Sequence, residues 1–205
     1  MTPIEAVGAC SAIYGTPPSG FSKTFSVSGV VGGIMPTEHG TAVVFRGSDT
    51  AEDWFRDLDA VTTDVAGLGD LHAGFTDGLS DFLHAIAPDL SGVITLAGHS
   101  LGAARACIAA GMLALSGVEV GELYLFGCPK PGTSQLAKIV KEHVSAIHSY
   151  RNGNDPVPLV PDVPWLYAPV VNYQEIGFPA DPSNPFLDHL IANYMRAIAT
   201  LCAPH

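Results

Sequence analysis

The stretch Val93–Ala110, VITLAGHSLGAARACIAA, is the sequence feature that most limits what this chain can fold into. It begins with the β-branched and apolar residues of a buried strand and ends in an alanine-rich run that favours a helix. Ser100 lies between them, at the apex of an abrupt strand-to-helix turn. Side chains two positions before and after such an apex would collide, and Gly98 and Gly102 remove them. The pattern predicts a nucleophilic Ser100, with the N–H of Leu101 positioned to stabilise an oxyanion, and an ordinary strand-to-helix turn is the alternative.

Strands and helices alternate along the rest of the chain, with Gly and Pro between them. This alternation predicts an α/β fold, in which a mostly parallel central sheet has helices on both faces, formed as a single domain over residues 1–205. Open sheets of this kind bind ligands beyond the carboxyl ends of their strands, where Ser100 lies. The expected helices are 3–14, 51–58, 75–87, 104–115, 134–143 and 187–201, and the expected strands are 24–36 and 41–47 (a hairpin), 93–97, 120–127 and 144–150.

Charge and hydropathy exclude several classes of protein. The chain has 205 residues, 47% of them hydrophobic, and a formal net charge of -11, so no basic stripe is available to neutralise phosphates and we expect no nucleic-acid partner. No apolar run reaches the roughly 18 to 20 residues of a membrane span. The first residues, MTPIEAVGACSAIYG, lack the charged region of a signal peptide. We therefore expect a soluble chain without a transmembrane segment, which is either cytoplasmic or exported by another route. The sequence leaves the choice between these two and the oligomeric state open.

The four cysteines are Cys10, Cys107, Cys128 and Cys202. They form no CxxC pair and no spacing with histidine that would indicate zinc, so we expect no metal site. Small buried thiols are the favoured interpretation. A bridge between Cys10 and Cys202 is the alternative, since these residues fall in the first and last expected helices.

A serine hydroxyl at neutral pH is a weak nucleophile, so Ser100 needs an imidazole, which in turn needs a carboxylate. In this type of fold the acid follows the serine along the chain and lies on a loop after a later strand. Asp155 fits this position, because it follows the strand VSAIHSY on a turn made by Gly and Pro. Asp162 is the competing acid. The alternative for both Asp155 and Asp162 is that each is an ordinary surface aspartate in a turn.

Histidine order selects the base. The base is expected after the acid, which leaves His189 in PFLDHLIANY, at a boundary between loop and helix. A simple helix-start histidine beside Asp188 is the alternative. The remaining histidines fit less well: His143 and His148 precede the acid, His99 points from inside the elbow, His84 lies on a helix face, His39 belongs to a hairpin turn and His205 is the terminal residue.

Six segments in the same order resemble those of the fungal-type, or class 3, lipase family. They are TAVVFRGSDTAEDWFRDL, LHAGF, VITLAGHSLGAARA, LYLFGCPKPG, RNGNDPVPLVP and DHLIANY, from Thr41 to Tyr194. Their order and spacing are more specific than any one motif. The resemblance implies an α/β-hydrolase fold, a carboxylic ester hydrolase and no cofactor.

The resemblance also implies roles for individual residues. Ser100 would be the nucleophile, Asp155 the acid and His189 the base. Ser48, after the strand that ends in Phe-Arg-Gly, would complete the oxyanion hole with Leu101.

The segment between Ser48 and His72 corresponds to the lid of the family. In it Trp54, Phe55 and Leu58 fall on one side of an expected helix, and the alternative is that they anchor a surface helix to the core. His72 matches a histidine near the site, without an assigned chemical step, and Arg46 is expected to tie loops together.

The expected substrate is an acyl ester, which a lipid–water interface could present. The chain is shorter than typical secreted members of the family, so triglyceride, phospholipid, aryl and feruloyl-type esters all stay open. An acyltransferase or another serine hydrolase would use the same triad. A catalytically silent ligand-binding or scaffolding relative is the alternative from another class, because a fold does not guarantee turnover.

Overall fold

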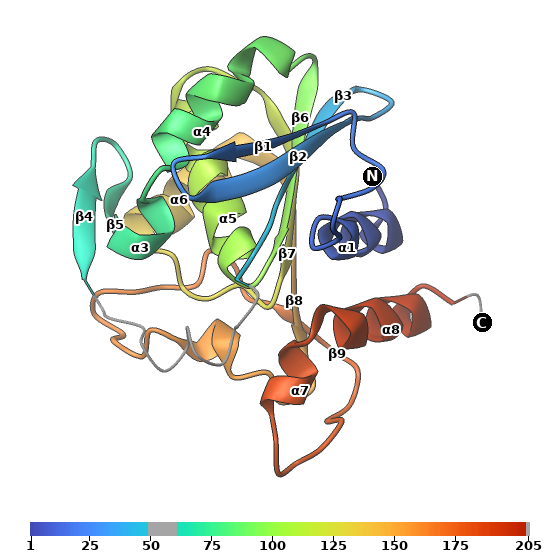
Figure 1. Cartoon of the computed structure of the whole chain (residues 1–205). Helices are drawn as coiled ribbons and strands as arrows, with labels where there is room; N and C mark the ends of the chain where they lie inside the picture. Colours follow the sequence, from blue (N-terminus) through green and yellow to red (C-terminus); the bar gives the residue numbers. More distant parts are fainter. Residues whose placement is uncertain (49–60, 204–205) are drawn as a thin grey trace.

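A seven-stranded sheet forms the centre of the structure, a computed structural model that describes residues 1–48 and 61–203 (Figure 1). The strand order is β1-β2-β3-β6-β7-β8-β9. Neighbouring strands are parallel from β3 to β9 and antiparallel in the pairs β1–β2 and β2–β3. The predicted mostly parallel sheet is confirmed. The strands are β1 (Lys23–Val27), β2 (Val30–Pro36), β3 (Gly40–Phe45), β6 (Val93–His99), β7 (Val120–Phe126), β8 (Val144–Asn152) and β9 (Gln174–Ile176).

The segment 24–36, expected as one strand, is itself a hairpin made of β1 and β2. Ser28 and Gly29 connect the two strands with φ angles of 47° and 78°. Positive φ at both central residues is what a two-residue type I′ turn requires, and Asn or Asp is commoner than Ser at the first position. The turn signal was therefore weak. The predicted hairpin between β2 and β3 is present.

Helices cover both faces of the sheet (Figure 1). α1 (Pro3–Ala12) and α8 (Ile191–Leu201) pack against each other on one face. The other face carries α3 (Ala73–Thr76), α4 (Leu79–Ile86), α5 (Leu101–Leu115) and α6 (Ser134–His143). Small side chains bring α5 close to the strands, and all of these are fully buried: Ala103, Ala104, Ala106, Ala109 and Ala110. The helices therefore enclose one apolar cluster on each side of the sheet.

Local signals explain where the outer helices begin and end. The hydroxyl of Thr2 accepts a hydrogen bond from the N–H of Glu5, and the Glu5 carboxylate accepts one from the N–H of Thr2, which is the predicted capping box of α1. The expected helix 75–87 is interrupted by Gly78, whose φ is 69°. The expected helix 187–201 is divided at Leu190, which has extended backbone angles. A short helix, α7 (Phe186–His189), thus ends at His189.

The chain between Ser48 and His72 is described only from residue 61 onward. Its described part is a two-stranded hairpin, β4 (Thr62–Val65) and β5 (Gly69–His72), which the sequence reasoning did not anticipate. Trp54, Phe55 and Leu58, expected on a lid helix, lie outside the described residues.

All four cysteines are free thiols, and Cys10 and Cys107 are buried, whereas Cys202 is exposed. A bridge between Cys10 and Cys202 would require α1 and α8 to pack together. The two helices do pack together, yet Cys10 and Cys202 are not joined.

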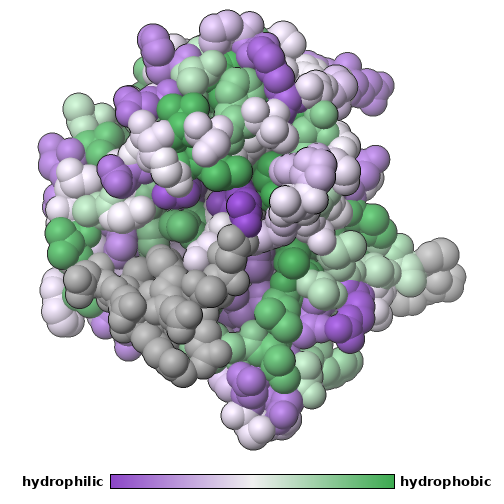
Figure 2. All heavy atoms as spheres, in the orientation of Figure 1, coloured by the Kyte–Doolittle hydropathy of each residue, from purple (hydrophilic) through white to green (hydrophobic). Residues whose placement is uncertain are grey.

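In the described part of the chain no helix has both the length and the apolar character needed to cross a bilayer. Figure 2 shows an apolar strip over α7 and the start of α8, a region in which Leu190 and Met195 are exposed.

Candidate active site

Ser100 lies in a strained turn between β6 and α5. Its φ and ψ are 59° and -131°, a conformation that a residue with a side chain rarely adopts. A Cβ atom at Gly98 would lie 2.2 Å from the carbonyl oxygen of Gly102, and one at Gly102 would lie 2.3 Å from the carbonyl oxygen of Phe45. Only glycine fits either position. The two glycines thus permit the turn that holds Ser100 at the carboxyl edge of the sheet.

Asp155 and His189 meet at the same edge, although 34 positions separate them in the sequence. Asp155 lies in the loop after β8, and His189 is the last residue of α7. His189 Nδ1 is 2.8 Å from Asp155 Oδ2, and both side chains are buried. An ionised carboxylate only accepts hydrogen bonds, so Nδ1 carries the proton and Nε2 is left as the acceptor. Among the described residues, neither His189 Nε2 nor Ser100 Oγ has a hydrogen-bond partner.

The Asp155 carboxylate is held in its ionised form. Burial raises its pKa, but the charge of His189 and hydrogen bonds from His189, from Tyr194 and from the N–H of Val157 outweigh burial and lower the pKa below its ordinary value. A Cβ atom at Gly127, after β7, would lie 2.9 Å from Asp155 Oδ2 and 3.0 Å from His189 Nδ1. Glycine at this position leaves room for the pair.

His99 supports His189 from the elbow itself. Its ring stacks on the His189 ring with centroids 4.7 Å apart, and its Nε2 lies 2.7 Å from the carbonyl oxygen of His189. A carbonyl only accepts, so Nε2 carries the proton, and Nδ1 accepts the hydrogen bond from the Tyr14 hydroxyl at 3.0 Å. Burial, followed by the charge of His189, lowers the pKa of His99 to about 3. His99 is therefore a neutral support for His189, and Ser100 is the next residue along the chain.

The loop after β3 lies against the elbow. A Cβ atom at Gly47, the residue before Ser48, would be 3.3 Å from Cβ of Ser100. The Arg46 guanidinium lies over the Tyr14 ring, 5.7 Å from its centroid. Leu101 is the first residue of α5, where helix N–H groups have no partner within the helix and the helix dipole favours negative charge.

The competing acids lie elsewhere or serve the backbone. Asp162 is exposed and is 3.9 Å from Lys130 Nζ, so it does not meet His189. Asp188 is fully buried beside His189, but its two oxygens accept hydrogen bonds from the N–H groups of Asn154 and Ala180 at 2.8 and 2.7 Å. Asp188 therefore fastens two loops around the site.

Sequence reasoning did not assign roles to Tyr14, Asp188 or Tyr194. Tyr194 donates a hydrogen bond to Asp155 Oδ2 at 2.6 Å, and its only signal in the sequence was its place at the end of DHLIANY. His72, expected near the site, is buried and stacked on Phe75 with ring centroids 3.8 Å apart. Among the described residues, no group of His, Cys, Asp and Glu could hold a metal ion.

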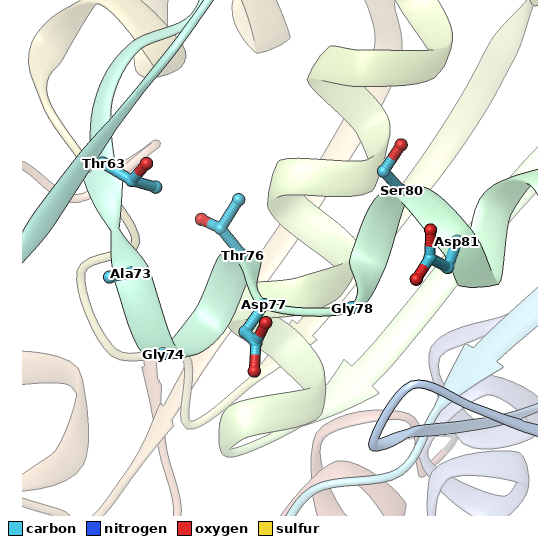
Figure 3. Close-up of a pocket in the computed structure, with 8 residues that line it drawn as sticks. All are labelled: Thr63, Ala73, Gly74, Thr76, Asp77, Gly78, Ser80 and Asp81. Carbon is cyan, nitrogen blue, oxygen red and sulfur yellow. The ribbon is translucent and has the colours of Figure 1, made fainter.

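A separate groove of about 530 Å³ lies between β4 and the α3–α4 segment (Figure 3). It contains none of the residues around Ser100. Its polar groups include the carboxylates of Asp77 and Asp81, of which Asp81 accepts a hydrogen bond from Ser28 at 2.7 Å. The residues that line this groove include no histidine beside their serine and threonine hydroxyls. Its lining residues are Thr63, Ala73, Gly74, Thr76, Asp77, Gly78, Ser80 and Asp81.

The strained turn at Ser100 and the hydrogen bond between His189 and Asp155 agree with the comparisons of this sequence with known proteins. The model of the family described as "Lipase (class 3)" matches residues 42–165. The chain belongs to the class 3 lipase family. The resemblance seen in its sequence segments is thereby confirmed.

Two relatives of known kind are secreted mono- and diacylglycerol lipases. That of Fusarium solani is 32% identical over 136 residues, covering 61% of this chain and 40% of the relative. That of Penicillium cyclopium is 30% identical over 171 residues, covering 77% of this chain and 53% of the relative. The chain thus spans about half the length of these relatives.

A lipase from Rhizopus microsporus var. chinensis has a similar solved structure. It superposes with a TM-score of 0.69 at 21% identity, covering 88% of this chain and 72% of that lipase. This likeness supports the α/β-hydrolase fold of the family.

Proposed function

We propose that this chain is a single α/β-hydrolase domain that hydrolyses carboxylic esters through Ser100, Asp155 and His189. The observation that carries the proposal is the buried 2.8 Å hydrogen bond between His189 and Asp155, together with the φ of 59° at Ser100 in the turn after β6. Membership of the lipase family supports the same reaction class.

In the proposed mechanism Ser100 Oγ attacks the ester carbonyl carbon while His189 Nε2 takes the hydroxyl proton. Asp155 holds the Nδ1–H tautomer and stabilises the imidazolium. The N–H groups of Ser48 and Leu101, with the Ser48 hydroxyl, bind the oxyanion. The leaving alcohol takes the proton from His189, and an acyl-enzyme remains. Water then attacks the acyl-enzyme with His189 as base, which releases the acid and restores Ser100.

We infer that the substrates are acyl esters of glycerol or of similar alcohols. The support is that the two relatives are mono- and diacylglycerol lipases, of which this chain spans about half the length. The acyl length that the site accepts is the first property to measure.

The test is hydrolysis of nitrophenyl esters with graded acyl lengths, together with labelling by a fluorophosphonate probe. Ser100→Ala should fold normally and lose at least about a thousandfold in kcat, since only binding and oxyanion effects remain. Ser116→Ala is the matched control, because Ser116 is an exposed serine at the end of the same helix, α5. Removal of one oxyanion donor with Ser48→Ala should cost less, about a hundredfold. Near wild-type turnover or probe labelling in Ser100→Ala would refute the mechanism.

A further inference from the structure

Tyr194 connects α8 to the end of β8 and to the acid of the site. It lies in the first turn of α8 and is fully buried. Its Oη is 3.1 Å from the backbone nitrogen of Asn152 and 2.6 Å from Asp155 Oδ2. The Asn152 N–H can only donate, so it occupies an acceptor position of the phenol. The phenolic proton therefore points at Asp155.

Oδ2 of Asp155 thus receives two hydrogen bonds, from the Tyr194 hydroxyl at 2.6 Å and from His189 Nδ1 at 2.8 Å. Oδ1 accepts the N–H of Val157 at 2.9 Å. These three donors come from α8, α7 and the loop after β8, so they define the orientation of the carboxylate. Burial, the charge of Asp155 and the hydrogen bond to it raise the pKa of Tyr194 well above its ordinary value, so the phenol keeps its proton.

We propose that Tyr194 is a positioning residue for ester hydrolysis, acting on His189 through Asp155. Its hydroxyl holds Oδ2 in line with Nδ1 of His189. It also places the positive end of an O–H dipole beside the atom that His189 binds. The dipole partly offsets the negative charge of Asp155 that His189 experiences. Because that charge stabilises the imidazolium, the offset makes the imidazolium less favourable. This role rests on the proposed function of Ser100, Asp155 and His189.

Three other titratable groups surround the pair. His99 on β6 stacks on His189 and is neutral, because burial lowers its pKa to about 3. Arg151 on β8 donates from Nε to the backbone carbonyl of Asp155 at 2.9 Å, and its Nη1 is 3.4 Å from Glu175. Asp188 on α7 accepts the two backbone N–H groups already described. None of the three donates to the Asp155 carboxylate. Within residues 1–48 and 61–203, the side chains that donate to it are those of His189 and Tyr194.

The experiment measures kcat/KM of Tyr194→Phe against pH on a soluble nitrophenyl ester. Rates are divided by the concentration of sites that a fluorophosphonate titrates, which removes any loss of folded protein. We expect kcat to fall about tenfold with little change in KM, because a hydrogen bond to a charged group is lost. We also expect the acid limb of the profile to move up by about half a pH unit, since the imidazolium is then more favoured.

Tyr150→Phe is the matched control. Tyr150 is also a buried tyrosine, on β8, but its ring stacks on Phe126 and it does not touch Asp155 in the described contacts. It should leave the acid limb in place. A second variant keeps the hydroxyl: 3-fluorotyrosine in place of Tyr194 is a stronger donor and should move the acid limb down.

The outcomes are distinguishable. If the wild-type protein hydrolyses esters but the acid limb is unchanged in Tyr194→Phe and with 3-fluorotyrosine, the role of Tyr194 is refuted and the proposed function stands. If both tyrosine variants move the acid limb in the same direction, the dipole argument is refuted. If the wild-type protein neither hydrolyses esters nor reacts with the probe, the proposed function falls, and the role of Tyr194 falls with it.

Discussion

The substitutions Asp155→Asn and Asp188→Asn should distinguish a residue that is needed for the rate of ester hydrolysis from one that is needed for the stability of the fold. Asp188 is fully buried, and each of its oxygens accepts one backbone N–H. Asparagine has one oxygen and one NH₂ group, so one of the two partly buried N–H groups would face another donor. A lost pairing of this kind costs about 1–3 kcal/mol. In a domain of this size each kcal/mol lowers Tm by about 2–4 °C, so Asp188→Asn should melt about 5 °C lower.

Asp155→Asn should cost similar stability and far more activity. If the amide oxygen takes the place of Oδ2, the NH₂ group faces the N–H of Val157. If the amide is reversed, the NH₂ group faces His189 Nδ1 and Tyr194, and the imidazole must adopt the tautomer that carries its proton on Nε2. That tautomer cannot accept the serine proton, and a loss of about 10⁴ in kcat is expected.

The assay combines thermal melting with nitrophenyl ester hydrolysis, the rates being expressed per folded protein. Asp162→Asn is the exposed control and should change neither quantity, because the Asp162 side chain is 83% exposed. A loss of kcat in Asp188→Asn as large as that in Asp155→Asn would refute the separate roles. A larger loss in Asp162→Asn would refute the choice of acid.

Two further predictions concern the elbow. Gly102→Ala should lower both Tm and probe labelling of Ser100, because the added Cβ would lie 2.3 Å from the Phe45 carbonyl oxygen; a wild-type melting curve with full labelling would contradict the steric argument. Stability against denaturant should fall as pH falls from about 6.5 toward 3, because the unfolded chain binds a proton at His99 in that window, whereas burial keeps the folded residue neutral down to about pH 3. Denaturation midpoints measured across this range test the sign, and His99→Gln should show a smaller decline.

Local pattern was sufficient for the elements that carry the site. The strand β6, the elbow and α5 follow from one stretch of sequence, and the chain order of serine, acid and histidine points to residues that lie at one edge of the sheet. The local sequence pattern could not predict contacts between residues that are far apart along the chain. The hydrogen bond from Tyr14 to His99 joins residues 85 positions apart, and that from Tyr194 to Asp155 joins residues 39 apart. Neither tyrosine has a local signal that differs from that of an ordinary core aromatic.

The missed strands have a related cause. β9 has only three residues, Gln174–Ile176. It is a strand because it pairs with the end of β8, and it has no alternation of apolar and polar residues that would predict a strand. Hydrogen bonds to a neighbouring strand can make a strand of a segment with a weak pattern. This short strand is nevertheless important for the site, because the segment that follows it leads to α7, which ends at His189. The Gly153 N–H donates to the Ile176 carbonyl at 2.9 Å, which joins the loop of Asp155 to the segment that leads to His189. The geometry of the acid–base pair therefore depends on an element that only the folded sheet defines.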